Sequence, residues 1–231
     1  MNSAAPVRCQ NDPMTDVASA TRGSSRPSIG ARAFDALDIA ATALFGLEGA
    51  AAAAHAGFDL LGVVAVGLIV ALAGGVLRDV LLGDLPPAAL RTPSRIIAGL
   101  AAALVAFVFI EGVDAFPVFP LQIMDAIGLA LFAVTGAQKA SASGANLWVV
   151  TILGTLAATG GGVIRDVLLA RTPYVLSESI YGTAAAAGAV VTGILLAATG
   201  RPRLALGVGF AVALALRLGA VIWGWSLPRI A

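Results

Sequence analysis

Two arginine–aspartate pairs stand in otherwise apolar stretches of the sequence: Arg78-Asp79 and Arg165-Asp166. An ionised side chain in hydrocarbon costs at least about 2.5 kcal/mol, so each must face the protein interior, find a partner or reach the surface. Neighbours on a helix point about 100° apart, which argues against pairing within each dipeptide. We therefore expect crosswise pairs, Arg78 with Asp166 and Arg165 with Asp79. Such pairs either lock two halves of the protein together or border a path for ions, and the sequence leaves both alternatives open.

Glycines precede both pairs at the same distance, Gly74 and Gly75 in the first copy and Gly160, Gly161 and Gly162 in the second. Each glycine lowers helix propensity by about 1 kcal/mol relative to alanine, and glycine pairs are common kink sites. The pattern predicts a break in each helix, whose freed carbonyl groups could bind a small cation. The first copy has Ala73 where the second has a third glycine, so we expect the second break to be the more flexible.

Four further charged residues lie in or near apolar stretches: Asp38, Glu48, Asp125 and Lys139. Asp38 and Asp125 fit either helix N-termini, where the helix dipole favours a carboxylate, or cation-attracting positions at two mouths of a path. Glu48 and Lys139 either border the same path or extend to the surface. His55 is expected to end a helix at the membrane interface.

The sequence argues against an enzyme, a metal centre and a nucleic-acid-binding protein. It contains one cysteine, Cys9, and one histidine, so neither a disulfide framework nor a cysteine- or histidine-based metal site is expected. No nucleophile is accompanied by a base, and no phosphate-binding loop follows a predicted strand. The net charge of +1 provides no basic face for nucleic acid. We expect no cofactor.

Composition makes lipid the solvent for most of the chain. Of 231 residues, 59% are hydrophobic and only 12% are charged, and the mean hydropathy is +0.94. Spanning the hydrocarbon takes about 20 apolar residues, and seven segments qualify as predicted helices. They are Asp35–His55, Leu60–Leu82, Arg95–Glu111, Leu121–Ala140, Leu147–Ala170, Ser179–Thr199 and Leu204–Trp225. The predicted fold class is therefore an all-α membrane protein with seven transmembrane helices, preceded by a flexible polar tail at 1–32.

An internal repeat organises these segments. A register of 87 residues, which aligns the two glycine motifs, also aligns Asp38 with Asp125, Phe45 with Phe132 and Pro86 with Pro173. Each unit holds three predicted helices, an odd number, so the second must be inverted relative to the first. The predicted organisation is a first repeat at 33–115, a second at 120–200 and a seventh helix at 203–226.

The doubled motif Gly-Gly-Val-Leu-Arg-Asp and Gly-Gly-Val-Ile-Arg-Asp, each followed by Val-Leu-Leu and a proline, resembles the prokaryotic branch of the trimeric intracellular cation (TRIC) channel family. The resemblance covers about residues 33–225. It implies a homotrimer in the inner (cytoplasmic) membrane, each protomer crossing the membrane several times and holding its own pore for monovalent cations, mainly potassium. The implied pore runs between the inverted repeats, past kinks in the second and fifth helices, and bound membrane lipid is an implied partner.

A second class of function stays open, because similar bacterial sequences are also labelled as transporters of glycine or a similar small molecule. Inverted repeats suit a carrier as well as a channel. The sequence has no obvious cradle for the carboxylate and ammonium groups of an amino acid, which favours the channel. A scaffold without transport is disfavoured, since the glycines are expected to weaken the helices without a gain in packing.

Overall fold

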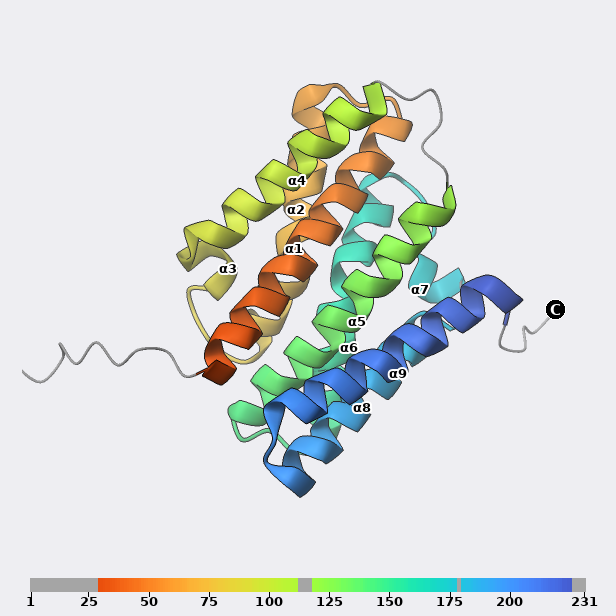
Figure 1. The fold of residues 1–231 in the computed structure, drawn as a ribbon. Helices are drawn as coiled ribbons and strands as arrows, with labels where there is room; N and C mark the ends of the chain where they lie inside the picture. Colours follow the sequence, from red (N-terminus) through yellow and green to blue (C-terminus); the bar gives the residue numbers. More distant parts are fainter. Residues whose placement is uncertain (1–28, 112–117, 178–179, 226–231) are drawn as a thin grey trace, which may run out of the picture.

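The computed structural model describes residues 29–111, 118–177 and 180–225, and in these ranges it is helical without strands. The helices are α1 (Ile29–His55), α2 (Leu60–Leu81), α3 (Ala88–Arg91), α4 (Pro93–Glu111), α5 (Val118–Ala142), α6 (Leu147–Leu168), α7 (Tyr174–Ser177), α8 (Gly182–Thr199) and α9 (Pro202–Trp223) (Figure 1). The all-α membrane fold is confirmed. The predicted tail at 1–32 lies mostly outside the described residues.

Six of the seven predicted spans are long and apolar enough to cross a membrane, namely those of α1, α2, α5, α6, α8 and α9. The seventh prediction corresponds to α4, whose described apolar part, Pro93–Phe109, is shorter. Two short helices were not expected. α3 and α7 each follow a glycine-motif helix, at equivalent places in the two repeats.

The two repeats run in opposite directions, as predicted. α1 and α5 lie side by side, and their chains travel in opposite senses (Figure 1). Matching residues also start the second helix of each repeat, where Asp59 accepts a hydrogen bond from the backbone of Gly62 and Asn146 accepts one from Val149. Such caps satisfy amide groups that the first helical turn leaves free.

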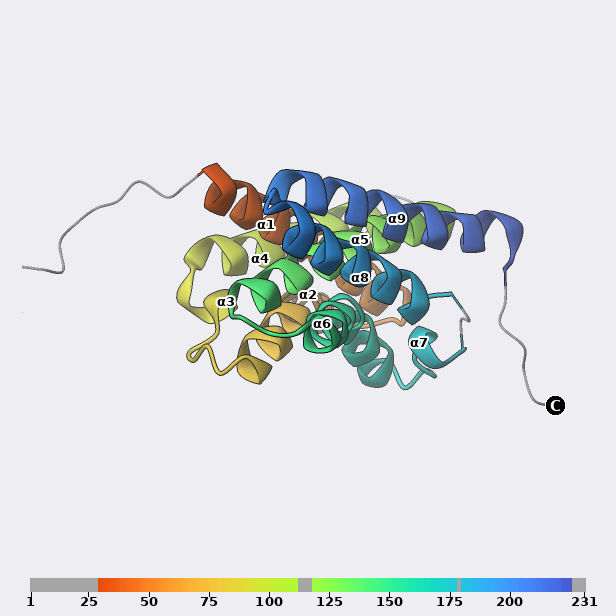
Figure 2. The same cartoon turned by 90° about the horizontal axis from the view of Figure 1, so that it is seen from below.

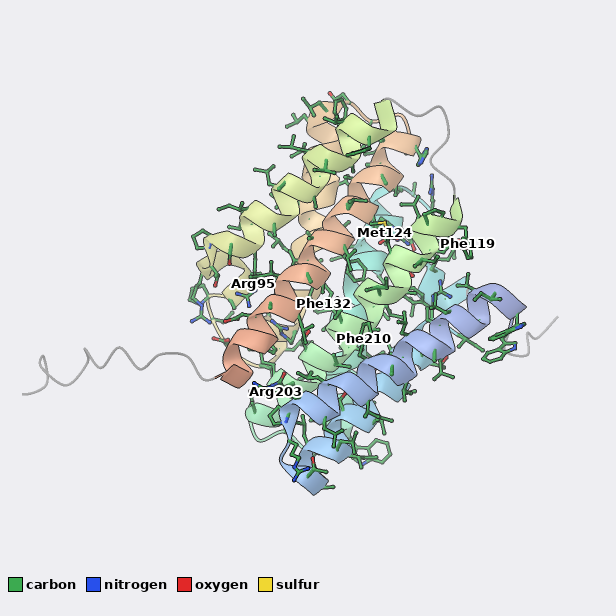
Figure 3. All side chains as sticks on the ribbon, viewed as in Figure 1. Arg95, Phe119, Met124, Phe132, Arg203 and Phe210 are labelled. Atoms are coloured by element: carbon green, nitrogen blue, oxygen red, sulfur yellow. The ribbon has the colours of Figure 1, made fainter. Side chains whose placement is uncertain are left out.

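The centre of the molecule is built from residues that the 87-residue register relates. Phe45 of α1 and Phe132 of α5 place their ring centroids 5.4 Å apart, and Phe132 points towards α1 in Figure 3. α1, α5 and α9 lie in one layer, with α2 and α6 crossing beneath it (Figure 2). α9, outside the repeats, packs against α5 and α8.

The predicted breaks at the glycines are wrong, because α2 and α6 are continuous helices through both motifs. The glycines instead allow close packing at the crossing of α2 and α6. A Cβ atom on Gly74 would lie 2.1 Å from the carbonyl oxygen of Ala157, and one on Gly161 would lie 2.9 Å from that of Val70. These two contacts are equivalent in the 87-residue register. The glycines therefore do bring a gain in packing, which removes the argument made against a scaffold.

Candidate functional site

Each arginine of the repeated motif bonds to its own neighbour. Arg78 Nε donates to Asp79 Oδ1 at 2.8 Å, and Arg165 Nε donates to Asp166 Oδ1 at 2.8 Å. The predicted crosswise pairs are therefore wrong. The prediction considered only the directions of the Cα–Cβ bonds, whereas the long arginine side chain can fold along the helix surface and return its guanidinium to the next residue.

The second oxygen of each motif aspartate holds the start of the following short helix. Asp79 Oδ2 accepts from the backbone amide of Ala88 at 2.9 Å, and Asp166 Oδ2 accepts from that of Tyr174 at 2.8 Å. A carboxylate is favoured at a helix N-terminus. The Arg-Asp motif therefore fixes the short helix that follows α2 and the one that follows α6.

Around the first motif, five buried or partly buried charges form what we call the first-repeat ion cluster: Asp38, Arg78, Asp79, Arg95 and Lys139. Asp38 accepts from Arg78 Nη1 and from Arg95 Nε, both at 2.8 Å. Lys139 Nζ donates to Asp79 Oδ1 at 2.7 Å. Figure 3 shows Arg95 on α4 beside α1. Every charge in this cluster therefore has an oppositely charged partner.

At its exposed edge the cluster continues to Asp84, in the turn after α2. Lys139 Nζ donates to Asp84 Oδ2 at 2.7 Å, and Arg91 Nη2 donates to Asp84 Oδ1 at 2.5 Å. The hydrogen bond from Lys139 lowers the pKa of the Asp84 carboxyl below its ordinary value. Lys139 therefore joins α5 of the second repeat to the end of α2 in the first.

Around the second motif lies a cavity of about 430 Å³, which we call the second-repeat cavity. Its charged lining consists of Glu48, Asp125, Arg165, Asp166, Arg171 and Arg217. Glu48 comes from α1, so the cavity lies between the two repeats, and Arg217 comes from α9. Glu48 pairs with Arg165 Nη1, so an ion pair joins the two repeats here, as the pairs of Lys139 do at the first motif.

Asp125 sits in the wall of this cavity and has weaker charged support than Asp38. It accepts a hydrogen bond from the Tyr181 hydroxyl at 2.8 Å, and Arg217 Nη2 lies 3.6 Å from its other oxygen. The Arg217 guanidinium also lies over the Tyr181 ring, 4.8 Å from its centroid. A neutral phenol thus takes the place near Asp125 that Arg95 takes near Asp38.

Three side chains that line the cavity carry a buried polar atom without a hydrogen-bond partner. These atoms are Glu48 Oε2, Arg165 Nη2 and Arg217 Nε. An unsatisfied buried polar group costs about 1–3 kcal/mol, and more when it is charged. None of the residues in the first-repeat ion cluster has such an atom among the described residues. The second-repeat cavity therefore combines open space with unpartnered polar atoms in its wall.

The predicted site residues are brought together, but with partners other than those expected. Asp38 and Asp125 lie about two turns or more inside α1 and α5, so neither is at a helix N-terminus. Asp38 is buried in ion pairs and not at a mouth, whereas Asp125 borders the cavity. Glu48 and Lys139 form ion pairs across the repeats and do not reach for the surface. His55 ends α1, as predicted.

Sequence reasoning missed three residues of these sites, Arg95, Tyr181 and Arg217. Arg95 and Tyr181 are 86 residues apart, one less than the register of the motif, so a comparison that tolerated a one-residue gap would have aligned them. Arg217 lies outside the repeat, and only its charge within an apolar segment marked it. No group of three or more His, Cys, Asp or Glu residues suited to a metal ion occurs in the described ranges.

Comparison with known proteins identifies the family to which this chain belongs. A family model described as "Glycine transporter" matches residues 35–111 and 122–197. The Escherichia coli inner membrane protein YadS is 32% identical over 196 residues, which cover 84% of this chain and 95% of that protein. The TRIC channel orthologue from Rhodobacter sphaeroides superposes with a TM-score of 0.79 at 35% identity, over 84% of this chain and 99% of that chain. The chain belongs to the prokaryotic TRIC channel family.

A second solved structure, described as the structural basis for conductance through TRIC cation channels, superposes with a TM-score of 0.78 at 38% identity. The match covers 86% of this chain and 97% of that chain. Membership of the TRIC family confirms two predictions. The chain is a multi-pass inner-membrane protein. It is not an enzyme, since the solved structures it resembles are channels.

Proposed function

We propose that this protein is a cation channel that conducts potassium and other monovalent cations, with one pore in each protomer of a homotrimer. The observation that carries the proposal is the second-repeat cavity, which lies between inverted repeats in a chain whose fold matches TRIC cation channels. Inverted repeats commonly place an ion path at their interface, near the middle of the bilayer.

The pathway we propose enters through the second-repeat cavity and continues along the crossing of α2 and α6. The cavity wall holds the carboxylates of Glu48, Asp125 and Asp166 together with the guanidinium groups of Arg165, Arg171 and Arg217, and in this proposal the carboxylate oxygens contact the permeant cation. In this proposal the motif glycines border the pore and act through packing, because they set how closely α2 and α6 approach each other. Small displacements at such a close contact change the width of a path beside it.

The trimer is supported by the described channel from Rhodobacter sphaeroides, which is named as trimeric. Many large apolar side chains are exposed on the described surface, among them Leu61, Ile97, Val108 and Ile222. In a membrane protein these side chains face either lipid or a neighbouring protomer. Membrane lipid is therefore a proposed partner alongside the permeant cations.

Transport of glycine or a similar small molecule is the second candidate. It is favoured by the description of the matching family and by the charges of both signs in the second-repeat cavity. A channel requires one continuous path, whereas a carrier binds its substrate in an occluded site and alternates between two conformations.

Electrical recording from purified protein in planar bilayers separates the two candidates. We expect discrete single-channel currents in potassium chloride, with a reversal potential that follows the potassium gradient. Saturable counterflow of glycine into liposomes, without such currents, would establish the carrier and refute the channel.

A matched pair of variants locates the path. Glu48→Gln removes a carboxylate from the cavity wall and should lower the potassium conductance. Asp59→Asn is the control, because it removes a carboxylate that does not line the cavity, while asparagine still caps α2. Equal conductance in both variants would exclude the second-repeat cavity from the ion path.

A further inference from the structure

Arg217 is the charged residue of the second-repeat cavity that neither repeat supplies. It lies on α9, which packs against α5 and α8 of the second repeat. Only 5% of the residue is exposed, and its side chain lines the cavity. A change at Arg217 therefore alters the charge of the cavity and leaves the repeated motifs as they are.

The Arg217 guanidinium is held loosely for a buried charge. Its Nη2 lies 3.6 Å from Asp125 Oδ2, which is beyond hydrogen-bond distance, and its Nε is buried without a partner. The guanidinium also lies over the Tyr181 ring, 4.8 Å from its centroid. In the first repeat, by contrast, Arg95 donates to Asp38 at 2.8 Å. Moving Arg217 away from Asp125 therefore breaks no hydrogen bond between these two side chains.

Asp125 is the carboxylate of the cavity with the weakest cationic partner. Arg165 bonds to both of the others, through Nη1 to Glu48 and through Nε to Asp166. Asp125 Oδ1 accepts from a neutral hydroxyl, and the charged partner of Oδ2 among the described residues is Arg217 at 3.6 Å. We therefore expect a cation that enters the cavity to be drawn to Asp125 Oδ2, where it meets the guanidinium.

The guanidinium and a second cation exclude each other at this oxygen. A cation in contact with Asp125 Oδ2 would lie a few ångströms from Arg217 Nη2, and like charges repel strongly at such a distance when little water separates them. Arg217 has room to withdraw. The residues three, four and seven positions further along α9 and its C-cap are Ala220, Val221 and Gly224, which line the cavity on the same face and are small.

We propose that Arg217 is a tethered cation that competes with permeant cations for the Asp125 carboxylate. With the guanidinium beside Asp125, the cavity carries its own counterion. When a permeant cation displaces the guanidinium, the carboxylate takes part in conduction, so α9 sets the ion concentration at which the path fills. This inference rests on the proposed conduction through the second-repeat cavity, but the competition is a binding equilibrium that can also be measured without currents.

Single-channel conductance measured against potassium concentration tests the proposal, with the full-length protein in planar bilayers. If the guanidinium occupies Asp125 for roughly two-thirds of the time or more, Arg217→Gln should lower the half-saturating potassium concentration about threefold or more. Arg217→Lys keeps a tethered charge and should stay close to the original protein. Arg203→Gln is the matched control, because it removes an exposed arginine from the start of the same helix (Figure 3).

Asp125→Asn locates the competition, because it removes the carboxylate for which the two cations compete. In a protein that carries Asp125→Asn, adding Arg217→Gln should no longer change the half-saturating concentration. An effect of Arg217→Gln that persists in this double variant would mean that Arg217 acts elsewhere, and would overturn the proposal. So would a half-saturating concentration that Arg217→Gln alone leaves unchanged or raises.

Melting temperatures of the same proteins in lipid nanodiscs give an answer that needs no ion flow. A bound cation stabilises the folded protein, so replacing the large cation N-methylglucamine by potassium at constant ionic strength should raise the melting temperature of Arg217→Gln most. The original protein and Arg203→Gln should respond less, and equal shifts in all three would overturn the competition at Asp125. The expected shifts in a protein without potassium currents would refute the proposed conduction and leave the competition intact. Arg217→Met, which fills similar space without a charge, takes the place of Arg217→Gln in both measurements if the glutamine variant does not fold.

Discussion

The two inverted repeats share a backbone plan but differ in how their buried charges are satisfied. Both contain the glycine crossing, the Arg-Asp hydrogen bond and an aspartate that caps a short helix. Around the first motif, Arg95 and Lys139 complete an ion cluster without unpartnered atoms in the described residues. Around the second motif, Asp125 has a neutral partner, Tyr181, and a longer ion pair with Arg217, and a cavity remains beside them. The repeat thus determines geometry, and residues outside the repeated motif determine which half is closed.

The largest contrast is expected between Asp38→Asn and Asp125→Asn. Asp38 neutralises two buried arginines, and removing one partner from a buried ion pair costs about 3–5 kcal/mol. Asp125 has a hydrogen bond from Tyr181 that asparagine can still accept, and its charged partner is 3.6 Å away. Unfolding in detergent micelles should show the larger loss for Asp38→Asn. Equal losses would mean that the two halves are electrostatically alike.

The second contrast concerns the crossing of α2 and α6. In Gly74→Ala the new methyl group would lie 2.1 Å from the backbone oxygen of Ala157, so the helices must separate. Such overpacking costs about 1–3 kcal/mol or more. Gly160→Ala is the matched control, because its nearest neighbour is the flexible end of Leu77 at 3.2 Å. Thermal unfolding should therefore rank Gly74→Ala well below Gly160→Ala, and the reverse order would refute the packing role of Gly74.

Alanine in place of the last glycine of each motif, Gly75 or Gly162, should change the free energy of unfolding with opposite signs in the two repeats. In Gly162→Ala the methyl group would lie 2.9 Å from the Tyr181 hydroxyl and disturb its hydrogen bond to Asp125, for a net loss of about 1 kcal/mol. Gly75→Ala meets only ordinary contacts beyond 3.5 Å and should gain up to about 1 kcal/mol of helix propensity. Melting temperatures measured side by side decide the matter, and a shift of the same sign in both would contradict it.

The smallest expected effect is in the turns that follow the motifs. Gly83 and Ala170 occupy equivalent positions, with φ of 72° and 53°. A left-handed conformation costs a residue with a side chain roughly 1–2 kcal/mol. Ala170→Gly should therefore stabilise the protein by about 0.5–1 kcal/mol, and Gly83→Ala should destabilise it by about 1 kcal/mol. Chemical unfolding curves provide the test, which fails if Ala170→Gly lowers the stability.

The sequence was sufficient to predict the fold and most of the charged residues of the site, but not which of these residues pair with one another. Segment length and hydropathy predicted the membrane helices, and the register that aligned Phe45 with Phe132 also identified a pair that meets at the centre. Glycine spacing was misread, because glycines that loosen a helix in isolation also allow two helices to touch. The predicted ion-pair partners of Arg78 and Arg165 were wrong, because the direction of a Cα–Cβ bond does not limit where a long side chain places its charge.

The cavity itself could not be predicted from the sequence. Its charged lining comes from separate helices, with Glu48 on α1, Asp125 on α5 and Arg217 on α9. Which of the two similar halves stays open depends on side chains such as Tyr181 and Arg95, whose equivalence is offset by one residue from the main register. Only packing in three dimensions reveals that one half is filled and the other is not.

The ion pairs that cross between the repeats have a consequence for how the chain is inserted as it is made. Glu48 is synthesised long before Arg165, and Asp79 long before Lys139. When the first three long helices have left the ribosome, Asp79 already has Arg78 as a partner, whereas the cation that pairs with Glu48 is supplied by the second repeat. The first half is therefore an incomplete insertion product, which has to keep the Glu48 carboxylate hydrated or shielded until the later helices arrive.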